Sequence, residues 1–579
     1  MYVLLLRMHQ HCTAASQGLI IHVRRQNQDT AGQNSLGQIV SQARFVTATD
    51  VSSPGTAGQS RHVYFRSTLK VGILYHGLRS PYETGIPFVT KDLARRAFVA
   101  LIWRGLAMGG EKIIFLVRLL ILARLLLPED FGLVAIGMTV LAVATSVTDF
   151  GVVAALIQQP ATDKRHLDTA WTIGLIRGVI VTASLLVLAP FIAELFNEAR
   201  ATDIIRALAL TALMHATASI EVARLNRELR FHGLAAVRLS AAVANTVVAI
   251  VLAPHYGAWA LVWGALTAAL INSVLSYAVA PYRPGLRLTD TATATIARFG
   301  RWIFLIGVLG VAADAILRWL VATRLGVAEL GLFFLAVRLA FLPSQLVSEL
   351  VSDVAFPVYA ELQRDREKAA AAFRGLLVSV SLALIPLCMV FAVLMPDLVQ
   401  HVLGDRWQGA VVITQLLILS SIVGLLGDGI APVLKGTGHP SGIAVMDALQ
   451  LALIAILGWP LTGSYGLVGA GVAWLAAIVA SQGLAAWYAR RLFEKPFDGL
   501  VAPLAAIFSA ALAATLTAAL VAGALSGPTG LVAAVLAAAG ATAIVILVLD
   551  RCFRLGILQT ISGPMPWLRR FAGAGVRPG

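Results

Sequence analysis

The chain has 579 residues, of which 58% are hydrophobic and only 13% are charged. Soluble domains average about 25% charged residues, so this chain lacks the side chains that would cover several soluble domains. The composition excludes a soluble protein and predicts an integral membrane protein with many spans. The formal net charge of +15 indicates positively charged cytoplasmic loops or an anionic ligand. Because the basic residues are spread over many short segments, we expect no nucleic-acid partner.

The first ninety residues differ from the rest of the chain. Residues 1–90 are rich in Gln, Ser, Thr, Gly and Arg and contain no apolar run that could span a bilayer. The apolar stretch 1–6 is too short for the core of a signal peptide. We interpret 1–90 as a disordered extension or a mis-assigned start, because it cannot bury enough apolar surface to fold. A cytosolic regulatory tail is the alternative.

Apolar segments dominate the sequence from residue 98 onward, and fourteen of them are long enough to cross about 30 Å of hydrocarbon as helices. We therefore predict an all-α integral membrane protein. Six segments fall within an N-terminal bundle at 91–290, six within a second bundle at 291–495, and two within 496–579. The predicted spans are 98–126, 131–158, 168–193, 203–221, 233–253, 257–280, 299–324, 329–357, 372–396, 410–434, 440–461, 465–489, 499–524 and 529–550.

Basic residues occur in every second connection between these segments, from Arg95 to Arg554. The remaining connections are acidic or neutral, with Arg200 and Arg406 as exceptions. The positive-inside rule predicts that the basic connections and both termini lie in the cytoplasm. Segment 221–231 is expected to form either an amphipathic helix on anionic membrane lipids or a solvated helical linker.

An internal repeat divides the chain into two similar halves. Arg118, Arg124 and Glu129 recur 200 positions later as Arg318, Arg324 and Glu329, and the Tyr-Gly pair at 256–257 recurs at 465–466. Six spans return the chain to the same side of the membrane, so the repeat is direct. It predicts two pseudo-symmetric six-helix bundles with a binding site between them near the midplane.

Three motifs carry a resemblance to a known family. They are Arg-Leu-Leu-Leu-Pro-Glu-Asp-Phe-Gly-Leu-Val-Ala at 124–135, Thr-Asp-Phe-Gly-Val-Val-Ala-Ala-Leu-Ile-Gln at 148–158 and Val-Leu-Lys-Gly-Thr-Gly-His-Pro at 433–440. Across about residues 91–495, the chain resembles the polysaccharide transporter family, the Wzx-type flippases of lipid-linked oligosaccharides. These belong to the MOP (multidrug/oligosaccharidyl-lipid/polysaccharide) superfamily.

The resemblance implies a fold and a function. The two six-helix bundles would form a V around a central cavity, with two extra C-terminal helices. The cargo would be an undecaprenyl-pyrophosphate-linked oligosaccharide, flipped across the bacterial inner membrane by alternating access. The polysaccharide polymerase machinery is a further expected partner.

Ionisable residues inside predicted spans are costly and usually face a cavity or a partner. Arg118 and Arg318 stand at matching depth in the two halves, and we predict that they approach a pyrophosphate from opposite sides. The other cationic candidates for this cavity are Arg177, Lys112 and Arg338. Internal ion pairs, Glu111 with Lys112 and Asp314 with Arg318, are the structural alternative. Candidates for ion coupling are Asp314, Asp428 and Asp447.

Other functions are disfavoured by missing motifs. The sequence contains no phosphate-binding loop and no nucleophile elbow, and its three cysteines, Cys12, Cys388 and Cys552, are far apart. We expect no metal, no cofactor and no enzymatic activity. Two alternatives stay open: a MATE-like drug or ion antiporter on the same fold and, less favoured, an integral-membrane sugar polymerase or glycosyltransferase.

Overall fold

The computed structural model divides the chain into two units, Met1–Phe88 and Val89–Gly579. The described residues are 91–149, 164–227, 231–287, 290–345, 366–436, 439–525 and 527–553. The predicted extension at 1–90 and the tail beyond residue 553 lie outside them.

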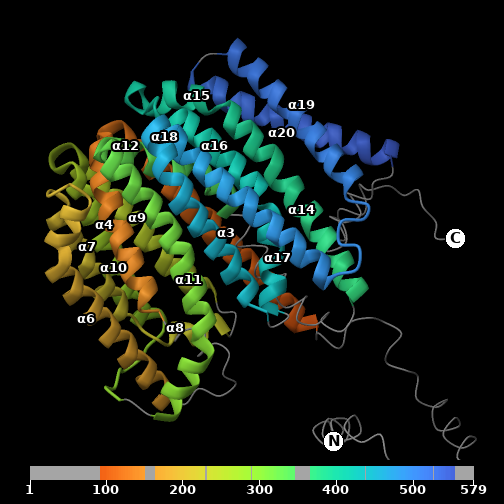
Figure 1. Cartoon of the computed structure of the whole chain (residues 1–579). Helices are drawn as coiled ribbons and strands as arrows, with labels where there is room; N and C mark the ends of the chain where they lie inside the picture. Colours follow the sequence, from red (N-terminus) through yellow and green to blue (C-terminus); the bar gives the residue numbers. More distant parts are fainter. Residues whose placement is uncertain are drawn as a thin grey trace, which may run out of the picture. The chain divides into compact units, whose positions relative to one another are not determined.

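All regular structure in these residues is helical, and every predicted span overlaps at least one helix (Figure 1). The longer helices are α3 (Lys91–Leu125), α4 (Pro128–Val147), α6 (Lys164–Leu195), α7 (Ala201–Ala216), α9 (Phe231–Tyr256), α10 (Ala258–Val279), α11 (Asp290–Leu325), α12 (Val327–Ala340), α14 (Arg366–Val393), α16 (Ala410–Val423), α17 (Leu425–Gly436), α18 (Ser441–Leu492), α19 (Val501–Ala524) and α20 (Pro528–Phe553). Short pieces are α8 (Val222–Arg227), α15 (Met395–Leu398), the π-helix η3 (Val399–Leu403) and the 3₁₀-helix η4 (Asp405–Trp407).

Nine of the described helices are long and apolar enough to cross a membrane, or ten if the bent pair of α16 and α17 is one span. The predicted count of fourteen is higher for structural reasons. Helices α7 and α12 have only 16 and 14 residues, and α18, with 52 residues, covers two predicted spans. The number of spans therefore stays a prediction, whereas the all-α membrane fold is confirmed.

The two halves share an unusual backbone break. Helices α9 and α10 meet at Gly257, with φ 53° and ψ −128°, and α18 breaks at Gly466, with φ 60° and ψ −140°. Only glycine adopts this conformation readily. The Tyr-Gly pairs of the sequence repeat thus have the same local structure.

Helices of the two halves pack together at the ends where α4 and α12 begin. In Figure 1, α4, α6, α7 and α10 lie on one side and α14, α16 and α17 on the other, with α19 and α20 beyond them. Helix α4 of the first half packs against α11 and α12 of the second, and α19 packs against α14 and α20. The largest fully buried side chains include Trp407, Phe131 and Phe333, so part of the core lies where the halves meet.

Two glycines allow this close packing, and they do so reciprocally. A Cβ added at Gly132 of α4 would overlap the backbone oxygen of Val327, and one added at Gly331 of α12 would overlap that of Pro128. Each glycine thus lies against a backbone oxygen at the start of the other helix. We call Pro128, Gly132, Val327 and Gly331 the glycine seam.

One carboxylate joins two helix starts beside the glycine seam. The Asp130 side chain accepts hydrogen bonds from the backbone N–H of Leu127 and from that of Ala258, both at 2.9 Å. It therefore satisfies donors at the N-termini of α4 and α10. Gly257 lies so close that a Cβ there would be 2.9 Å from Asp130 Oδ1.

Candidate functional site

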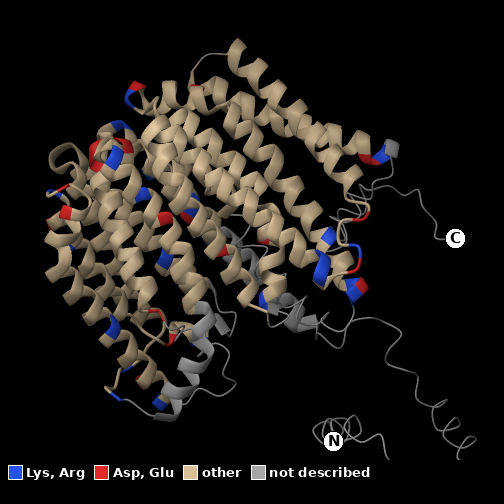
Figure 2. Ribbon diagram, in the orientation of Figure 1, with Lys and Arg blue, Asp and Glu red and all other residues tan. Residues whose placement is uncertain are grey.

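Most charged residues lie near helix ends, but a few lie within the helices (Figure 2). Three of these are arginines that alternate with two phenylalanine rings. The Cζ atom of Arg118 on α3 is 5.4 Å from the centroid of Phe115. That of Arg338 on α12 is 5.9 Å from Phe115 and 5.0 Å from Phe334, and that of Arg318 on α11 is 5.8 Å from Phe334. Each distance falls within cation–π range, and we call these five residues the Arg–Phe cluster.

The positive charges of the Arg–Phe cluster are only partly compensated. Arg318 is 8% exposed, lies 2.8 Å from the Asp314 carboxylate and donates to Thr139 Oγ1 at 3.2 Å. Asp314 is the one acidic residue ion-paired with the cluster in the part of the chain that the structure describes. Arg118 and Arg338 are half-buried, so the cluster holds three guanidinium groups against one paired carboxylate.

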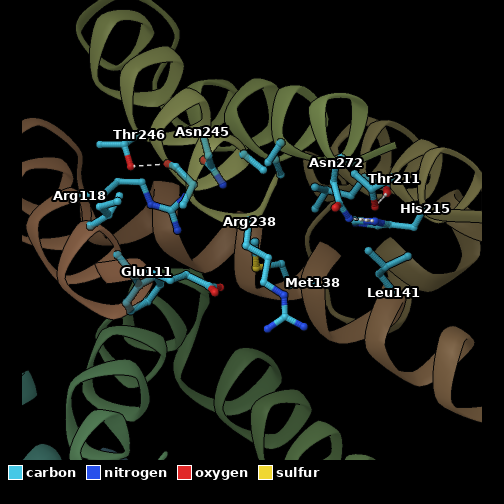
Figure 3. A pocket seen from close by; sticks show the side chains of 18 of the residues that line it. Glu111, Arg118, Met138, Leu141, Thr211, His215, Arg238, Asn245, Thr246 and Asn272 are labelled. Atoms are coloured by element: carbon cyan, nitrogen blue, oxygen red, sulfur yellow. Dashed lines mark hydrogen bonds between the residues drawn. The ribbon is translucent and has the colours of Figure 1, made fainter. Parts of the chain in front are cut away.

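Arg118 lines a cavity of about 490 Å³ between α3, α4, α7, α9 and α10, which we call the first cavity (Figure 3). Its wall on α3 carries Glu111 and Arg118. Polar side chains from the other helices are Thr211, His215, Arg238, Asn245, Thr246 and Asn272.

Arg338 lines an adjoining cavity of about 650 Å³, the second cavity, which lies mainly between α4, α6 and α7. The two cavities share five lining residues, so they are neighbouring parts of one hollow region. The shared residues are Met138, Leu141, Thr211, His215 and Val222.

Arg177 lines the second cavity but is held by the end of α4. Its Nη2 donates to the Thr145 carbonyl at 2.9 Å and its Nε to Thr148 Oγ1 at 3.1 Å. The guanidinium also lies 3.6 Å from the Asp149 carboxylate. These contacts give Arg177 a structural role as well as a place at the cavity wall.

The structure brings only some of the predicted site residues together. One cluster contains Arg118, Arg318 and Arg338. Within it, Arg318 forms an ion pair with Asp314, which is the internal ion pair predicted from the sequence as the structural alternative. Lys112 instead donates to Gln345 Oε1 at 3.2 Å. Asp428 is exposed on α17 and Asp447 half-buried on α18.

Neither Asp428 nor Asp447 is among the residues that line the two cavities. The described residues contain no group of three or more His, Cys, Asp or Glu that could hold a metal ion.

Phe115, Phe334, Asn245 and Asn272 were not predicted as site residues. Aromatic residues are too common in apolar spans to stand out. The two asparagines were the readable signal, because a polar amide inside a span needs a partner or a cavity.

Arg200 and Arg406, the two exceptions to the charge alternation, both make hydrogen bonds within the protein. Arg200 Nε donates to Glu198 Oε1 at 2.7 Å, and its Nη1 lies 3.4 Å from Glu129 Oε2. Arg406 Nη1 donates to the Leu126 carbonyl at 3.2 Å. Both side chains are therefore engaged with neighbouring acidic or carbonyl groups.

A family model described as polysaccharide biosynthesis protein matches residues 121–412, about half of the chain. The chain therefore belongs to this family. Lipopolysaccharide biosynthesis protein WzxC of Escherichia coli (strain K12) is 26% identical over 337 residues, covering 57% of this chain and 66% of that protein. Succinoglycan biosynthesis transport protein ExoT of Rhizobium meliloti (strain 1021) is 24% identical over 343 residues, covering 58% and 68%. The chain thus matches about two thirds of the length of these relatives.

Solved structures show the same fold. Lipid II flippase MurJ in an inward closed conformation matches with a TM-score of 0.65 and 13% identity, covering 78% of this chain and 99% of that one. An inward-facing multidrug resistance MATE family transporter of the MOP superfamily matches with a TM-score of 0.53 and 17% identity, covering 71% and 99%. At these identities the likeness is one of fold, and it agrees with the predicted all-α membrane fold.

Proposed function

We propose that the chain is a transporter that flips an undecaprenyl-pyrophosphate-linked oligosaccharide across the bacterial inner membrane. The observation that carries the proposal is the Arg–Phe cluster, which places Arg118 and Arg338 at the walls of two adjoining cavities. The names of the relatives support a role in polysaccharide synthesis, and the name of MurJ supports a lipid-linked cargo.

A pyrophosphate that links a lipid to a sugar carries two negative charges, and burying them without partners would cost many kcal/mol. Guanidinium groups suit this ligand because their planar forks donate paired hydrogen bonds to phosphate oxygens. Arg118 and Arg338 flank the same Phe115 ring, so both can reach one pyrophosphate. Arg318 contributes less directly, because Asp314 and Thr139 already engage it.

Contacts at the glycine seam support an alternating-access mechanism. Beside the seam, Arg124 donates to the carbonyls of His401 and Val402, and Trp407 Nε1 donates to the Ala123 carbonyl at 2.8 Å. These bonds tie α3 of the first half to the second half. The charge alternation assigns this end to the outer face, so we infer that the cargo enters from the cytoplasmic side while its lipid tail stays in the bilayer.

Deleting the gene tests the proposal directly. We expect loss of a surface or secreted polysaccharide and accumulation of its lipid-linked repeat unit on the cytoplasmic leaflet. Normal polymer with altered drug sensitivity would instead indicate an antiporter.

Point variants test the Arg–Phe cluster in the same cells. Arg118→Ala and Arg338→Ala each remove charge-assisted contacts worth about 1.5–3 kcal/mol, so export should fall about ten- to a hundredfold. Lysine at either position should restore export only in part, since it keeps the charge but not the fork. Arg206→Ala, on the exposed face of α7, is the matched control. Wild-type export by both alanine variants at normal membrane abundance would contradict the site.

A further inference from the structure

We propose that the saccharide of the cargo binds in the first cavity, against the side-chain amides of Asn245 and Asn272. This inference rests on the proposed function and adds a carbohydrate subsite to it. The pyrophosphate would lie at the Arg118 side of the same cavity.

Asn245 presents an amide that the protein itself does not satisfy. It lines the first cavity from α9, and among the described residues its side chain makes no hydrogen bond. Gly264 of α10 lies so close that a Cβ there would be 2.6 Å from Asn245 Oδ1. Because Asn245 is half-buried at the cavity wall, its amide keeps donor and acceptor capacity for water or a ligand.

Asn272 lines the same cavity from α10, and the one side-chain hydrogen bond that it makes among the described residues is long. Its Nδ2 lies 3.4 Å from His215 Nδ1 of α7, near the limit of a hydrogen bond. Asn272 therefore keeps donor and acceptor capacity for a ligand. Thr211 of α7 adds a hydroxyl oxygen that lines the cavity as an acceptor.

The first cavity is charged at one end and carries neutral polar groups at the other. In Figure 3, Arg118 and Glu111 project from α3 on one side, Asn272, Thr211 and His215 lie on the other, and Asn245 and Arg238 lie between them. Sugar hydroxyls both donate and accept hydrogen bonds, so neutral amides and hydroxyls match them without the desolvation cost of a charge. The arrangement fits a ligand that is anionic at one end and neutral and polyhydroxylated at the other.

The size of the site agrees with this division. The first cavity holds about 490 Å³, within the range of about 300–1,000 Å³ for small-molecule pockets. Arg118 lines the first cavity and Arg338 the second, with Phe115 between them. A pyrophosphate held by both arginines would place the attached sugar in the first cavity.

Binding measurements with two lipids test the subsite in the purified full chain in lipid nanodiscs. The probes are undecaprenyl pyrophosphate and the sugar-bearing lipid that accumulates in cells lacking this chain. Asn245→Leu and Asn272→Leu should each weaken binding of the sugar-bearing lipid about three- to tenfold, the loss of one or two neutral hydrogen bonds. Binding of undecaprenyl pyrophosphate should not change. Leucine has a similar size and favours an apolar helix, so the fold should survive.

Two further variants make the result decisive. Gln415→Leu also removes an amide from a membrane helix, but from α16 outside both cavities, and should leave both affinities unchanged. Arg118→Ala should weaken both lipids. If the asparagine variants bind both lipids as wild type does, or lose both equally, the carbohydrate subsite is wrong while the proposed function stands. If wild type binds neither lipid, the proposed function fails and the subsite fails with it.

Discussion

Glu198 and Arg200 form an ion pair in the short connection between α6 and α7. The Glu198 carboxylate is 15% exposed and receives the Arg200 guanidinium through two of its nitrogens, at 2.7 and 3.0 Å. The hydrogen bond from Arg200 holds the pKa of Glu198 below its usual value, although partial burial opposes this shift. The charged form of Glu198 is therefore favoured in the folded protein.

This lowered pKa predicts a pH-dependent contribution to stability. The contribution is fully present above the pKa of Glu198 in the unfolded chain, about 4.3, and is lost as pH falls through the lower folded value. Glu198→Gln should therefore lower the melting temperature at neutral pH, and the difference from wild type should shrink in acid. Thermal unfolding in detergent measures it, with Glu194→Gln, an exposed neighbour, as control. A difference that is constant with pH would contradict the ion pair.

Single residues also show where prediction of the site reached its limit. Spacing and depth identified Arg118 and Arg318 as interior cations, because helical periodicity and hydropathy are local properties of a sequence. Which of these arginines can still bind a ligand depends on the side chains that surround it in the folded protein. Asp314 engages Arg318 from one turn away on the same helix, whereas Arg338 reaches Phe115 from a different helix. The contact between Arg338 and Phe115 joins two distant parts of the chain, so no local sequence pattern predicts it.

At the scale of helices, Gly257 and Gly466 form a natural matched pair. Both have the same strained backbone conformation, yet their surroundings differ. A Cβ at Gly257 would meet Asp130 Oδ1 at 2.9 Å, whereas one at Gly466 would meet nothing within 4 Å.

We expect both Gly257→Ala and Gly466→Ala to destabilise the protein by about 1–3 kcal/mol through backbone strain. Gly257→Ala should cost more, because it also displaces the carboxylate that caps α4 and α10. Thermal unfolding of the two variants at equal expression compares them. Equal losses would mean that the Asp130 contact contributes nothing measurable.

Helix positions were predictable because each span is an apolar run between polar breaks. The bends and breaks of the helices were not predictable. Helices α16 and α17 bend by 45° within one predicted span. At Gly466 the break in α18 needs no polar loop, since one glycine with positive φ suffices. Hydropathy locates apolar length, but it does not encode such backbone dihedral angles.

At the scale of the whole molecule, the glycine seam holds the two halves together at one end. Its contacts involve backbone atoms, so a side chain that changes rotamer cannot relieve a clash there. On the proposed alternating-access mechanism, this end opens during each cycle. A methyl group in the seam should therefore favour the open arrangement.

Gly132→Ala and Gly331→Ala test the seam, with Gly310→Ala as control, since a Cβ at Gly310 meets nothing within 4 Å. Each variant would carry a reporter cysteine at Leu126, which is 2% exposed, in a background where the native cysteines are replaced. Labelling by a membrane-impermeant thiol reagent from the outer face should rise severalfold in the two seam variants. Unchanged labelling at normal membrane abundance would show that other contacts close this end.

The ion pair between Asp314 and Arg318 has a consequence for turnover. A carrier must release its cargo once in every cycle, so its residence time limits the rate as much as its affinity does. With Arg318 engaged by Asp314, two guanidinium groups of the cluster remain for a headgroup with two charges. A third free guanidinium would strengthen binding by about 1.5–3 kcal/mol and lengthen the residence time about ten- to a hundredfold. On the proposed function, Asp314 keeps the affinity for the cargo low enough for the cargo to be released in each cycle.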